Sequence, residues 1–133
     1  MDMCRTSLAG MGSRLTEIFQ FMERYGLAQL SSSANKDAGA YETYLTAYET
    51  PFLVANCTGT LEDFLTLTHE FGHFCDDYVN WGMSYNMDVA ECCSQGLEYL
   101  ALEYLDGVCE AEEAEQLLGG KLLDTLDLYV WQG

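Results

Sequence analysis

The spacing of apolar residues predicts a mainly helical chain that contains one short pair of strands. From Ser13 to about Tyr25, apolar side chains recur every three or four residues, which is typical of an amphipathic helix capped by Ser13. The preceding residues, 1–11, show no clear period and are expected to fray or to form a short helix. Two β-prone runs at 41–45 and 51–56 predict a β-hairpin, or two strands of a small sheet.

The second half of the chain is predicted to consist of helices separated by breaks. We expect one helix over residues 60–79, capped by the threonine at its start, and another over residues 87–105. A short acidic helix over 110–118 should end at Gly119-Gly120, and a last helix should follow over 121–131. A chain of 133 residues with this pattern indicates a single α+β domain, mainly α with a small β-hairpin.

The helix expected over residues 87–105 carries two stripes of different character. The mainly polar stripe comprises Glu91, Ser94, Gln95, Glu98 and Leu102. The apolar stripe comprises Cys93, Leu97, Leu100 and Tyr104. We therefore expect the apolar stripe to face the core.

The charge of the chain narrows the classes of ligand. The formal net charge is −17, and residues 37–133 contain nineteen acidic side chains against one cation, Lys121. Such a surface repels phosphate backbones and anionic membranes, so no nucleic-acid or membrane binding is expected. No run of eighteen apolar residues occurs that could form a transmembrane helix. Cationic or neutral ligands, including peptides, remain compatible, although most of the acids are expected to form a solvated face.

The N-terminus and the cysteines indicate a cytoplasmic protein. Residues 1–5 lack a basic segment followed by an apolar one, so no signal peptide is expected. Without a secretion signal, the six cysteines are interpreted as reduced thiols. The chain has no Cys-x-x-Cys pair, and the spacing of Cys75 and Cys92 matches no thiolate metal site, so such a site is disfavoured.

The segment His69-Glu70-Phe71-Gly72-His73 is the strongest candidate for chemistry. Two histidines four residues apart lie on one face of a helix, where both neutral imidazoles can reach one Zn²⁺ at about 2.0–2.1 Å. Glu70 projects beside that face, where a general base would stand. Gly72 removes a side chain where another element could pack closely. Because such a pair can also be ordinary surface or core histidines, a third ligand is the test.

Glu91 is the candidate for that third ligand. It follows His73 by eighteen residues, so two antiparallel helices joined by a short loop can bring it beside both histidines. Its neighbours Ala90 and Cys92-Cys93 suggest a buried context, in which an isolated carboxylate is costly unless it is paired or metal-bound. The alternative is an exposed helical acid. A His, His, Glu set with an open fourth position is typical of a catalytic zinc site.

Four segments in order carry a resemblance to a known family. They lie within residues 39–98 and comprise 39–44, 51–60, 67–73 and 90–98. Together they resemble the active-site core of the oligoendopeptidase F and thimet oligopeptidase family of zinc peptidases. The resemblance implies that His69, His73 and Glu91 bind the metal and that Glu70 is the general base. It also implies a zincin-like active-site helix packed against a second helix that carries the glutamate.

The resemblance carries further expectations about the surroundings of the site. The strand ending at Asn56 resembles the one that borders the family's substrate cleft. Family members are several times longer, and a later segment supplies Tyr and His side chains for the oxyanion; Tyr129 does not lie in a matching context. Ser94, Gln95 and Glu98 are candidates for contacts to the ligands, and they are equally compatible with an ordinary helix surface.

Two functions are consistent with these features. The first is a zinc metalloendopeptidase that binds one Zn²⁺ per chain and hydrolyses oligopeptides through a zinc-activated water, with Glu70 as general base. The alternative is a non-catalytic or incomplete peptidase fragment that keeps the metal-site fold and acts through association with another chain.

Large apolar residues on several helix faces also bear on assembly. They are Phe64, Phe71, Phe74, Trp81, Leu102, Leu105 and Trp131. Because these residues are not expected to fit into one small core, they favour a homodimer or a tight complex with another chain over a compact monomer.

Overall fold

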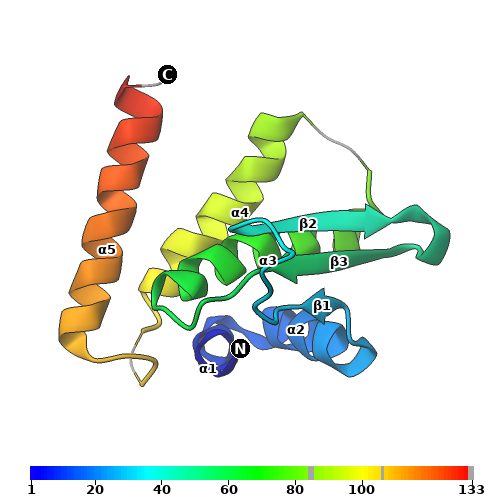
Figure 1. Cartoon of the computed structure of the whole chain (residues 1–133), viewed down its shortest axis with the longest axis horizontal. Helices are drawn as coiled ribbons and strands as arrows, with labels where there is room; N and C mark the ends of the chain where they lie inside the picture. Colours follow the sequence, from blue (N-terminus) through cyan, green and yellow to red (C-terminus); the bar gives the residue numbers. More distant parts are fainter. Residues whose placement is uncertain (84–85, 106, 132–133) are drawn as a thin grey trace.

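The computed structural model describes residues 1–83, 86–105 and 107–131, and within these ranges the chain forms five α-helices and a three-stranded sheet. The helices are α1 (Asp2–Met11), α2 (Ser13–Tyr25), α3 (Glu62–Asn80), α4 (Met87–Leu102) and α5 (Ala111–Leu126), with a π-helical turn at Asp127–Trp131. The strands are β1 (Ala28–Gln29), β2 (Ala40–Leu45) and β3 (Thr50–Ala55). Figure 1 shows α3 behind the sheet, α1 and α2 below it, and α5 apart at the left. The predicted class, mainly α with a small sheet, is confirmed.

The sheet has the strand order β1-β3-β2. β2 and β3 form the predicted antiparallel hairpin, with Glu42 opposite Leu53, and a short 3-10 turn at Thr46–Tyr48 joins them. β1 pairs parallel to β3 and was not predicted, because two residues are too few to carry a periodic pattern. β2 therefore forms one edge of the sheet.

The core lies between the sheet, α3 and the two N-terminal helices. From α3 it contains Phe64, Leu67, Phe71 and Phe74, all buried. The ring of Phe19 on α2 meets that of Phe71 edge to face, with centroids 5.2 Å apart. Burial of each large apolar side chain stabilises the fold by about 1.5–3 kcal/mol. The four buried side chains of α3 therefore hold the sheet and the two N-terminal helices against this helix.

The closest approach between helices occurs where α3 crosses α4. A Cβ atom on Gly72 would lie 2.5 Å from the Cα atom of Ser94 and 3.2 Å from the carbonyl oxygen of Cys93. Only glycine leaves room for this contact, as the sequence predicted. The crossing brings the middle of α4 directly against the helix that carries both histidines.

Two predicted helix caps are wrong. Ser13 is the first residue of α2, where Gly12 is the cap position, and makes no capping hydrogen bond. Thr60 precedes α3, whose cap position is Leu61, and no side chain caps this helix end with a hydrogen bond. The Asp63 carboxylate in the first turn accepts hydrogen bonds from backbone N–H groups of the preceding loop, from Thr58 at 2.9 Å and from Gly59 at 2.7 Å.

The predicted core-facing stripe of α4 is also wrong. The buried residues of this helix are Ser94, Leu97, Glu98 and Ala101. Of the predicted apolar stripe only Leu97 is buried, whereas Leu100 and Tyr104 are 42% and 38% exposed and Cys93 is exposed. The close contact at Gly72 turns the face of α4 that carries Ser94 toward α3. The helix also ends at Leu102 rather than at residue 105.

α5 is one continuous helix, so the predicted break at Gly119-Gly120 is wrong. A glycine inside a helix costs about 1 kcal/mol but removes no backbone hydrogen bond, and both glycines face open space. The helix is attached by the buried Leu117 and by polar contacts to α4. Its outer side exposes Leu118, Leu122, Leu123 and Leu126.

The reason given for a homodimer is partly wrong. Phe64, Phe71, Phe74 and Leu105 all share one core, and Leu102 packs partly buried against it. Trp81 is exposed, and the side chain of Trp131 lies outside the described residues. Association with another chain stays a prediction, and the exposed leucines of α5 are now the surface that favours it.

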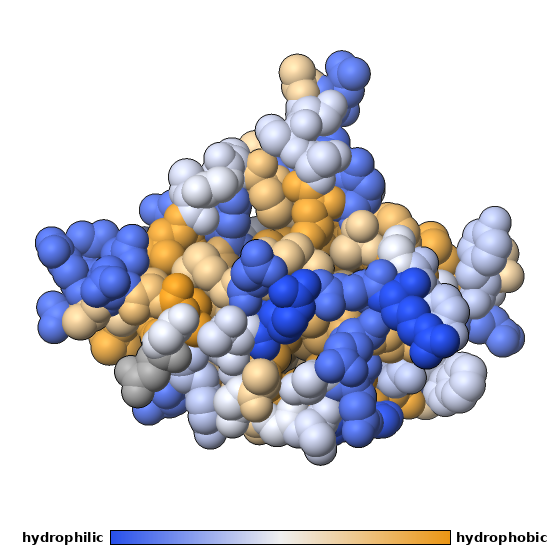
Figure 2. Space-filling view, turned by 90° about the horizontal axis from the view of Figure 1, so that it is seen from below, coloured by the Kyte–Doolittle hydropathy of each residue, from blue (hydrophilic) through white to orange (hydrophobic). Residues whose placement is uncertain are grey.

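The cations are concentrated on the two N-terminal helices. Arg5 belongs to α1, and Arg14 and Arg24 belong to α2. Seen from below, this face of the molecule carries deep-blue hydrophilic residues between orange apolar patches (Figure 2). Within the described ranges, no helix is long and apolar enough to cross a membrane.

We predict that Gly72→Ala destabilises the fold by at least about 1–3 kcal/mol, because the added methyl group would overlap the α4 backbone. The matched control is Gly96→Ala on α4, where an added Cβ meets nothing within 4 Å. That change should stabilise the helix by about 0.5–1 kcal/mol. Urea unfolding of the three proteins measures both effects, and equal stabilities for the two variants would contradict the close crossing.

Candidate metal centre

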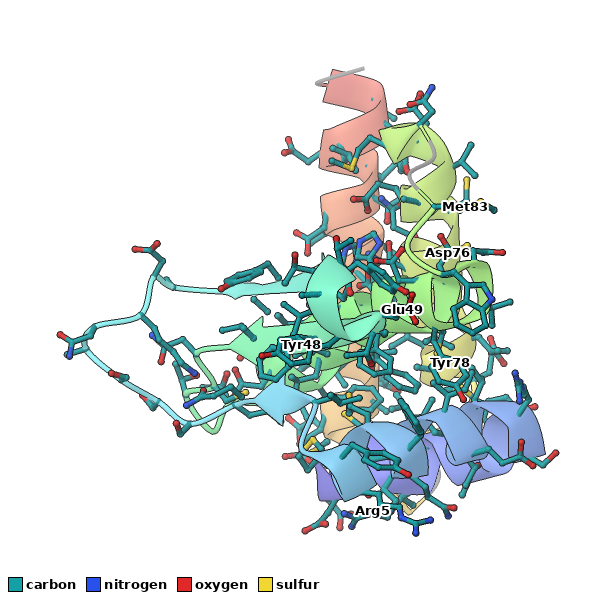
Figure 3. All side chains as sticks on the ribbon, turned by 90° about the vertical axis from the view of Figure 1, so that its right-hand side faces the viewer. Arg5, Tyr48, Glu49, Asp76, Tyr78 and Met83 are labelled. Carbon is teal, nitrogen blue, oxygen red and sulfur yellow. The ribbon has the colours of Figure 1, made fainter. Side chains whose placement is uncertain are left out.

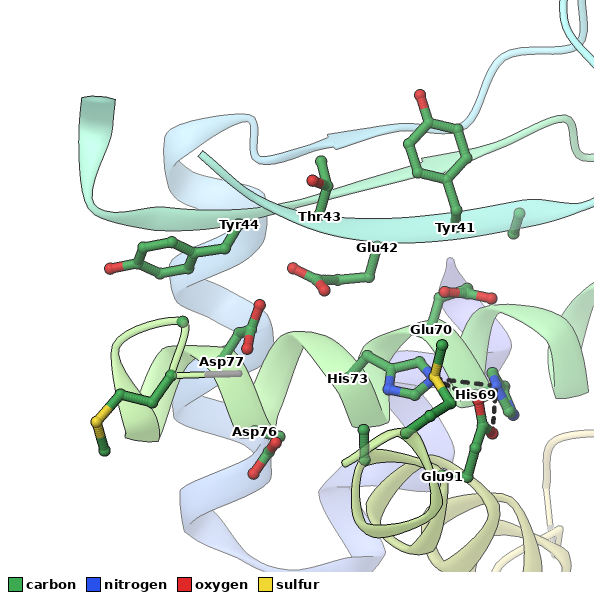
Figure 4. Close-up of a pocket in the computed structure, with 15 residues that line it drawn as sticks. Tyr41, Glu42, Thr43, Tyr44, His69, Glu70, His73, Asp76, Asp77 and Glu91 are labelled. Carbon is green, nitrogen blue, oxygen red and sulfur yellow. Dashed lines mark hydrogen bonds and ion pairs between the residues drawn. The ribbon is translucent and has the colours of Figure 1, made fainter. Parts of the chain in front are cut away.

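α3 and α4 bring four side chains to the same place. His69, Glu70 and His73 lie on α3, and Glu91 reaches them from the second turn of α4 (Figure 4). One possible ligand atom from each of His69, His73 and Glu91 lies within 4.8 Å of the other two. The residues that the sequence singled out therefore converge, and their role as ligands stays a prediction.

The two imidazoles and the Glu91 carboxylate lie close enough to share one metal ion. The Nε2 atoms of His69 and His73 are 3.2 Å apart. Oε2 of Glu91 lies 3.4 Å from Nε2 of His69, and its Oε1 lies 3.6 Å from Nε2 of His73. A tetrahedral zinc site with bonds of about 2.0–2.1 Å has ligand–ligand edges of about 3.3–3.4 Å. Two imidazoles and one carboxylate are also the donor types that zinc prefers, so these residues fit the ion.

Glu98 orients the first of the two imidazoles. Its Oε1 lies 2.6 Å from Nδ1 of His69, and because an ionised carboxylate can only accept, the Nδ1–H group donates. This bond leaves the Nε2 lone pair free to face the other ligand atoms. Burial acts to lower the pKa of His69, but the hydrogen bond and charge of Glu98 outweigh it and raise the pKa.

Glu98 is held in turn by Lys121. Glu98 is only 5% exposed, and its Oε2 lies 2.7 Å from the Nζ of Lys121 on α5. Burial acts to raise the pKa of Glu98, but the hydrogen bonds from His69 and Lys121 outweigh it and lower the pKa. The carboxylate therefore stays charged inside the protein, where an unpaired charge would be costly.

Glu91 is positioned by its own helix. The hydroxyl of Ser94, one turn later on α4, lies 3.2 Å from Oε2 of Glu91 and 3.1 Å from its carbonyl oxygen. Of the three candidates for contacts to the ligands, Ser94 and Glu98 thus make them. Gln95 instead accepts a hydrogen bond from the Tyr129 hydroxyl at 2.6 Å.

The four residues line a cleft of about 500 Å³ between β2, α3 and the start of α4. The edge strand β2 borders it through residues 40–44, so the expectation that the strand ending at Asn56 borders the cleft is wrong. Cys92 and Cys93 are exposed, so the buried context assumed for Glu91 is wrong as well. α4 brings Glu91 into the cleft through its crossing with α3, and not through apolar neighbours.

Glu70 faces this cleft beneath β2. Figure 4 shows its carboxylate pointing toward the strand, beside the imidazoles. Burial raises the pKa of Glu70 above its ordinary value, and the neighbouring histidines and the Glu42 backbone offset only part of that effect. A half-buried carboxylate with a raised pKa is suited to accept a proton and release it again.

Glu42 is a second buried carboxyl group in the cleft. It points from β2 toward Asp77 of α3 (Figure 4). Burial, followed by the charges of Asp77 and Glu70, raises the pKa of Glu42 to about 8. Sequence reasoning missed Glu42 and also Lys121. Alternation along β2 could have placed Glu42 on the inner face, whereas nothing local to Lys121 links it to Glu98.

Comparison with known proteins places the chain beside a peptidase family. The model of peptidase family M3 matches residues 17–125. No curated protein matches the chain.

Three solved structures have the same arrangement of elements. A protein assigned as oligoendopeptidase F from Bacillus anthracis is 25% identical, with a TM-score of 0.84 over 94% of this chain and 24% of that one. PZ peptidase A with an inhibitor is 26% identical, with a TM-score of 0.83 over 94% of this chain and 23% of that one. A peptidase from Chlamydophila abortus is 25% identical, with a TM-score of 0.79 over 98% and 23%. The chain thus spans about a quarter of the length of these proteins.

We predict that Glu42→Gln flattens the pH dependence of stability between about pH 4.5 and pH 8. In this window the unfolded chain releases the Glu42 proton and the folded chain keeps it, so the wild type loses stability as the pH rises. Solvent screening of this partly exposed group limits the expected difference to roughly 1–2 kcal/mol. Urea unfolding with a chelator present measures it. Glu103→Gln, at an exposed site, is the control, and a Glu42→Gln curve parallel to that control would contradict the assignment.

Proposed function

This chain belongs to peptidase family M3, and from that premise we propose that it is a zinc metallopeptidase that hydrolyses peptide bonds in oligopeptides. The observation that carries the proposal is the convergence of three donor atoms, from His69, His73 and Glu91, beside Glu70 in an open cleft. The chain spans about a quarter of the solved relatives, so its own activity is part of the proposal.

We propose that His69, His73 and Glu91 hold one zinc ion and leave a fourth position open toward the cleft. Zinc bound there would act as a Lewis acid and lower the pKa of a coordinated water to about 7. Glu98 supports the set by holding His69 in the tautomer whose Nε2 is unprotonated. Lys121 keeps Glu98 charged, and Ser94 restrains the Glu91 carboxylate.

In the proposed mechanism Glu70 carries the proton. Its carboxylate accepts a proton from the attacking water and then donates it to the leaving amine nitrogen of the peptide. The raised pKa of Glu70 brings its proton affinity closer to neutral pH, where both transfers are needed. The position of Glu70 beneath β2 places its carboxylate inside the cleft.

The metal assignment predicts that the protein binds about one Zn²⁺ per chain and that His73→Ala and Glu91→Gln lose most of it. Loss of one of three ligands should weaken zinc affinity by at least about a hundredfold, a larger effect than the 10–100-fold typical of outer-shell changes. Competition against a chromogenic chelator measures the affinity. The matched control is Glu103→Gln, which removes an exposed acid from the acidic part of the sequence. Full zinc occupancy of His73→Ala at low free zinc would show that the assignment is wrong.

The base assignment predicts that Glu70→Gln keeps zinc bound and loses peptide cleavage. The amide cannot accept the proton, so the turnover number should fall by about 10²–10⁴-fold. A fluorogenic oligopeptide assay beside the zinc titration measures both properties. Cleavage that survives the change would indicate another base, and a zinc-loaded wild type that cleaves no peptide would favour the non-catalytic alternative.

A further inference from the structure

A second cavity adjoins the metal cleft at the far end of α3. Its volume is about 410 Å³. Aromatic rings of Phe21, Tyr44, Tyr78 and Trp81 form its walls, and the carboxylates of Glu49 and Asp77 lie at its border. Figure 3 shows Glu49 and Tyr78 on the same face of the molecule as Asp76 and Met83, the latter two from the metal cleft.

The two cavities are continuous through two shared residues, Tyr44 and Asp77. In Figure 4 both lie at the end of the cleft away from Glu91, Tyr44 on β2 and Asp77 on α3 below it. The Tyr44 ring is held by Gly82, on which a Cβ atom would lie 2.3 Å from the ring carbons. The Tyr44 ring is therefore a wall common to both cavities, and a bound peptide can extend along it from one cavity to the other.

One face of α3 connects the metal ligands to the second cavity. His69, His73 and Asp77 follow at intervals of four residues, and Trp81 continues the series just past the end of the helix. Each interval advances about 6 Å along the axis, so Trp81 lies about 12 Å beyond His73. An extended peptide advances about 3.3 Å per residue, so this cavity corresponds to a position three or four residues from the cleaved bond.

Two helix ends place side chains at the walls of this cavity. Among the residues that the structure describes, only Trp81 and Glu49 adopt positive φ without being glycine, at 58° and 49°, and both line it. Each is the left-handed C-cap of a helical segment, Trp81 of α3 and Glu49 of the 3-10 turn, so the caps fix where both side chains begin. Trp81 is also 71% exposed, so core packing does not account for its position.

The charges around both cavities favour a cation. Asp76 and Asp77 follow one another along the metal cleft, and Glu49 adds a third carboxylate. Burial, and then the charge of Asp76, raises the pKa of Asp77, a repulsion that a bound cation would relieve. The one basic side chain among the described lining residues is Arg14, which is paired with Glu17 at 3.6 Å. Its guanidinium lies 5.9 Å from the Tyr78 ring centroid, so this wall already accepts a cation.

We propose that this cavity is a substrate subsite that takes a lysine or arginine side chain of the peptide, three or four residues from the cleaved bond. The inference rests on the proposed function, because the metal cleft defines where the peptide lies. The aromatic rings contact the aliphatic stem of the basic residue, and Glu49 and Asp77 contact its charged head. The acidic chain would thereby select basic oligopeptides among many possible substrates.

The test uses zinc-loaded full-length chain and pairs of fluorogenic peptides that differ only by lysine or norleucine at one position. Norleucine keeps the stem and removes the charge. We expect kcat/KM to be about five- to tenfold higher for lysine at the third or fourth residue on one side of the bond, and unchanged elsewhere. Glu49→Gln and Trp81→Ala should each remove most of this preference, and Trp81→Ala should also slow cleavage of the norleucine peptide, because the ring contacts the stem that both peptides share. Both residues are exposed, so folding should be unaffected.

The controls are Glu103→Gln and Tyr48→Ala, an exposed acid and a 78% exposed aromatic residue that do not line the cavity. Both should keep the preference. The same peptides are also titrated, by calorimetry, against zinc-loaded Glu70→Gln protein, which reports binding without turnover. Cleavage or binding without a lysine preference, or a preference that survives both cavity variants, would overturn the subsite while the peptidase proposal stands. Preferential binding that the cavity variants abolish, without cleavage by the wild type, would support the subsite and count against the peptidase.

Discussion

The crossing of α3 and α4 at Gly72 and Ser94 is the contact on which the metal centre depends. With no side chain on Gly72, the backbone of α4 lies against the histidine-bearing helix. Ser94 is fully buried at this point, and Glu91 and Glu98 lie about one helical turn before and after it on α4. Glu91 thereby faces the two Nε2 atoms, and Glu98 faces Nδ1 of His69. A wider separation of the helices would remove both carboxylates from the same imidazole.

Four glutamates in one small region are held in different environments, and the differences suit different tasks. Glu98 is buried but receives hydrogen bonds from His69 and Lys121, which lower its pKa and keep it charged. Burial raises the pKa of both Glu70 and Glu42, and Glu42 also feels neighbouring acids. Glu91 is the partly exposed carboxylate that faces both histidines. Distinct environments around chemically identical groups are how proteins separate a ligand, an orienting group and a base.

The negative charge of the chain also determines which ligands the cleft favours. The three arginines lie on α1 and α2, and none of them is among the described residues that line the metal cleft, although Arg14 lines the adjoining cavity with Asp77. Lys121, the single cation in the acidic part of the sequence, is used inside the protein to compensate Glu98. The cleft therefore presents uncompensated negative charge to whatever enters it, which suits a divalent metal ion and a cationic substrate and opposes an anionic one.

Local patterns in the sequence determined most of the secondary structure and the candidate ligand set. The four-residue spacing of His69 and His73 requires only that the segment be helical for both imidazoles to lie on one face. The β2–β3 hairpin and α2 follow from equally local periodicity. Features that depend on a partner far along the chain were decided by the tertiary structure. The inward face of α4 was predicted wrongly because Ser94 is buried by contact with Gly72, twenty-two residues earlier, and not by its own hydrophobicity. The pairing of Lys121 with Glu98 and the cavity that Tyr44 shares with Asp77 arise in the same way, since long-range packing joins groups whose sequence separation carries no periodic signal.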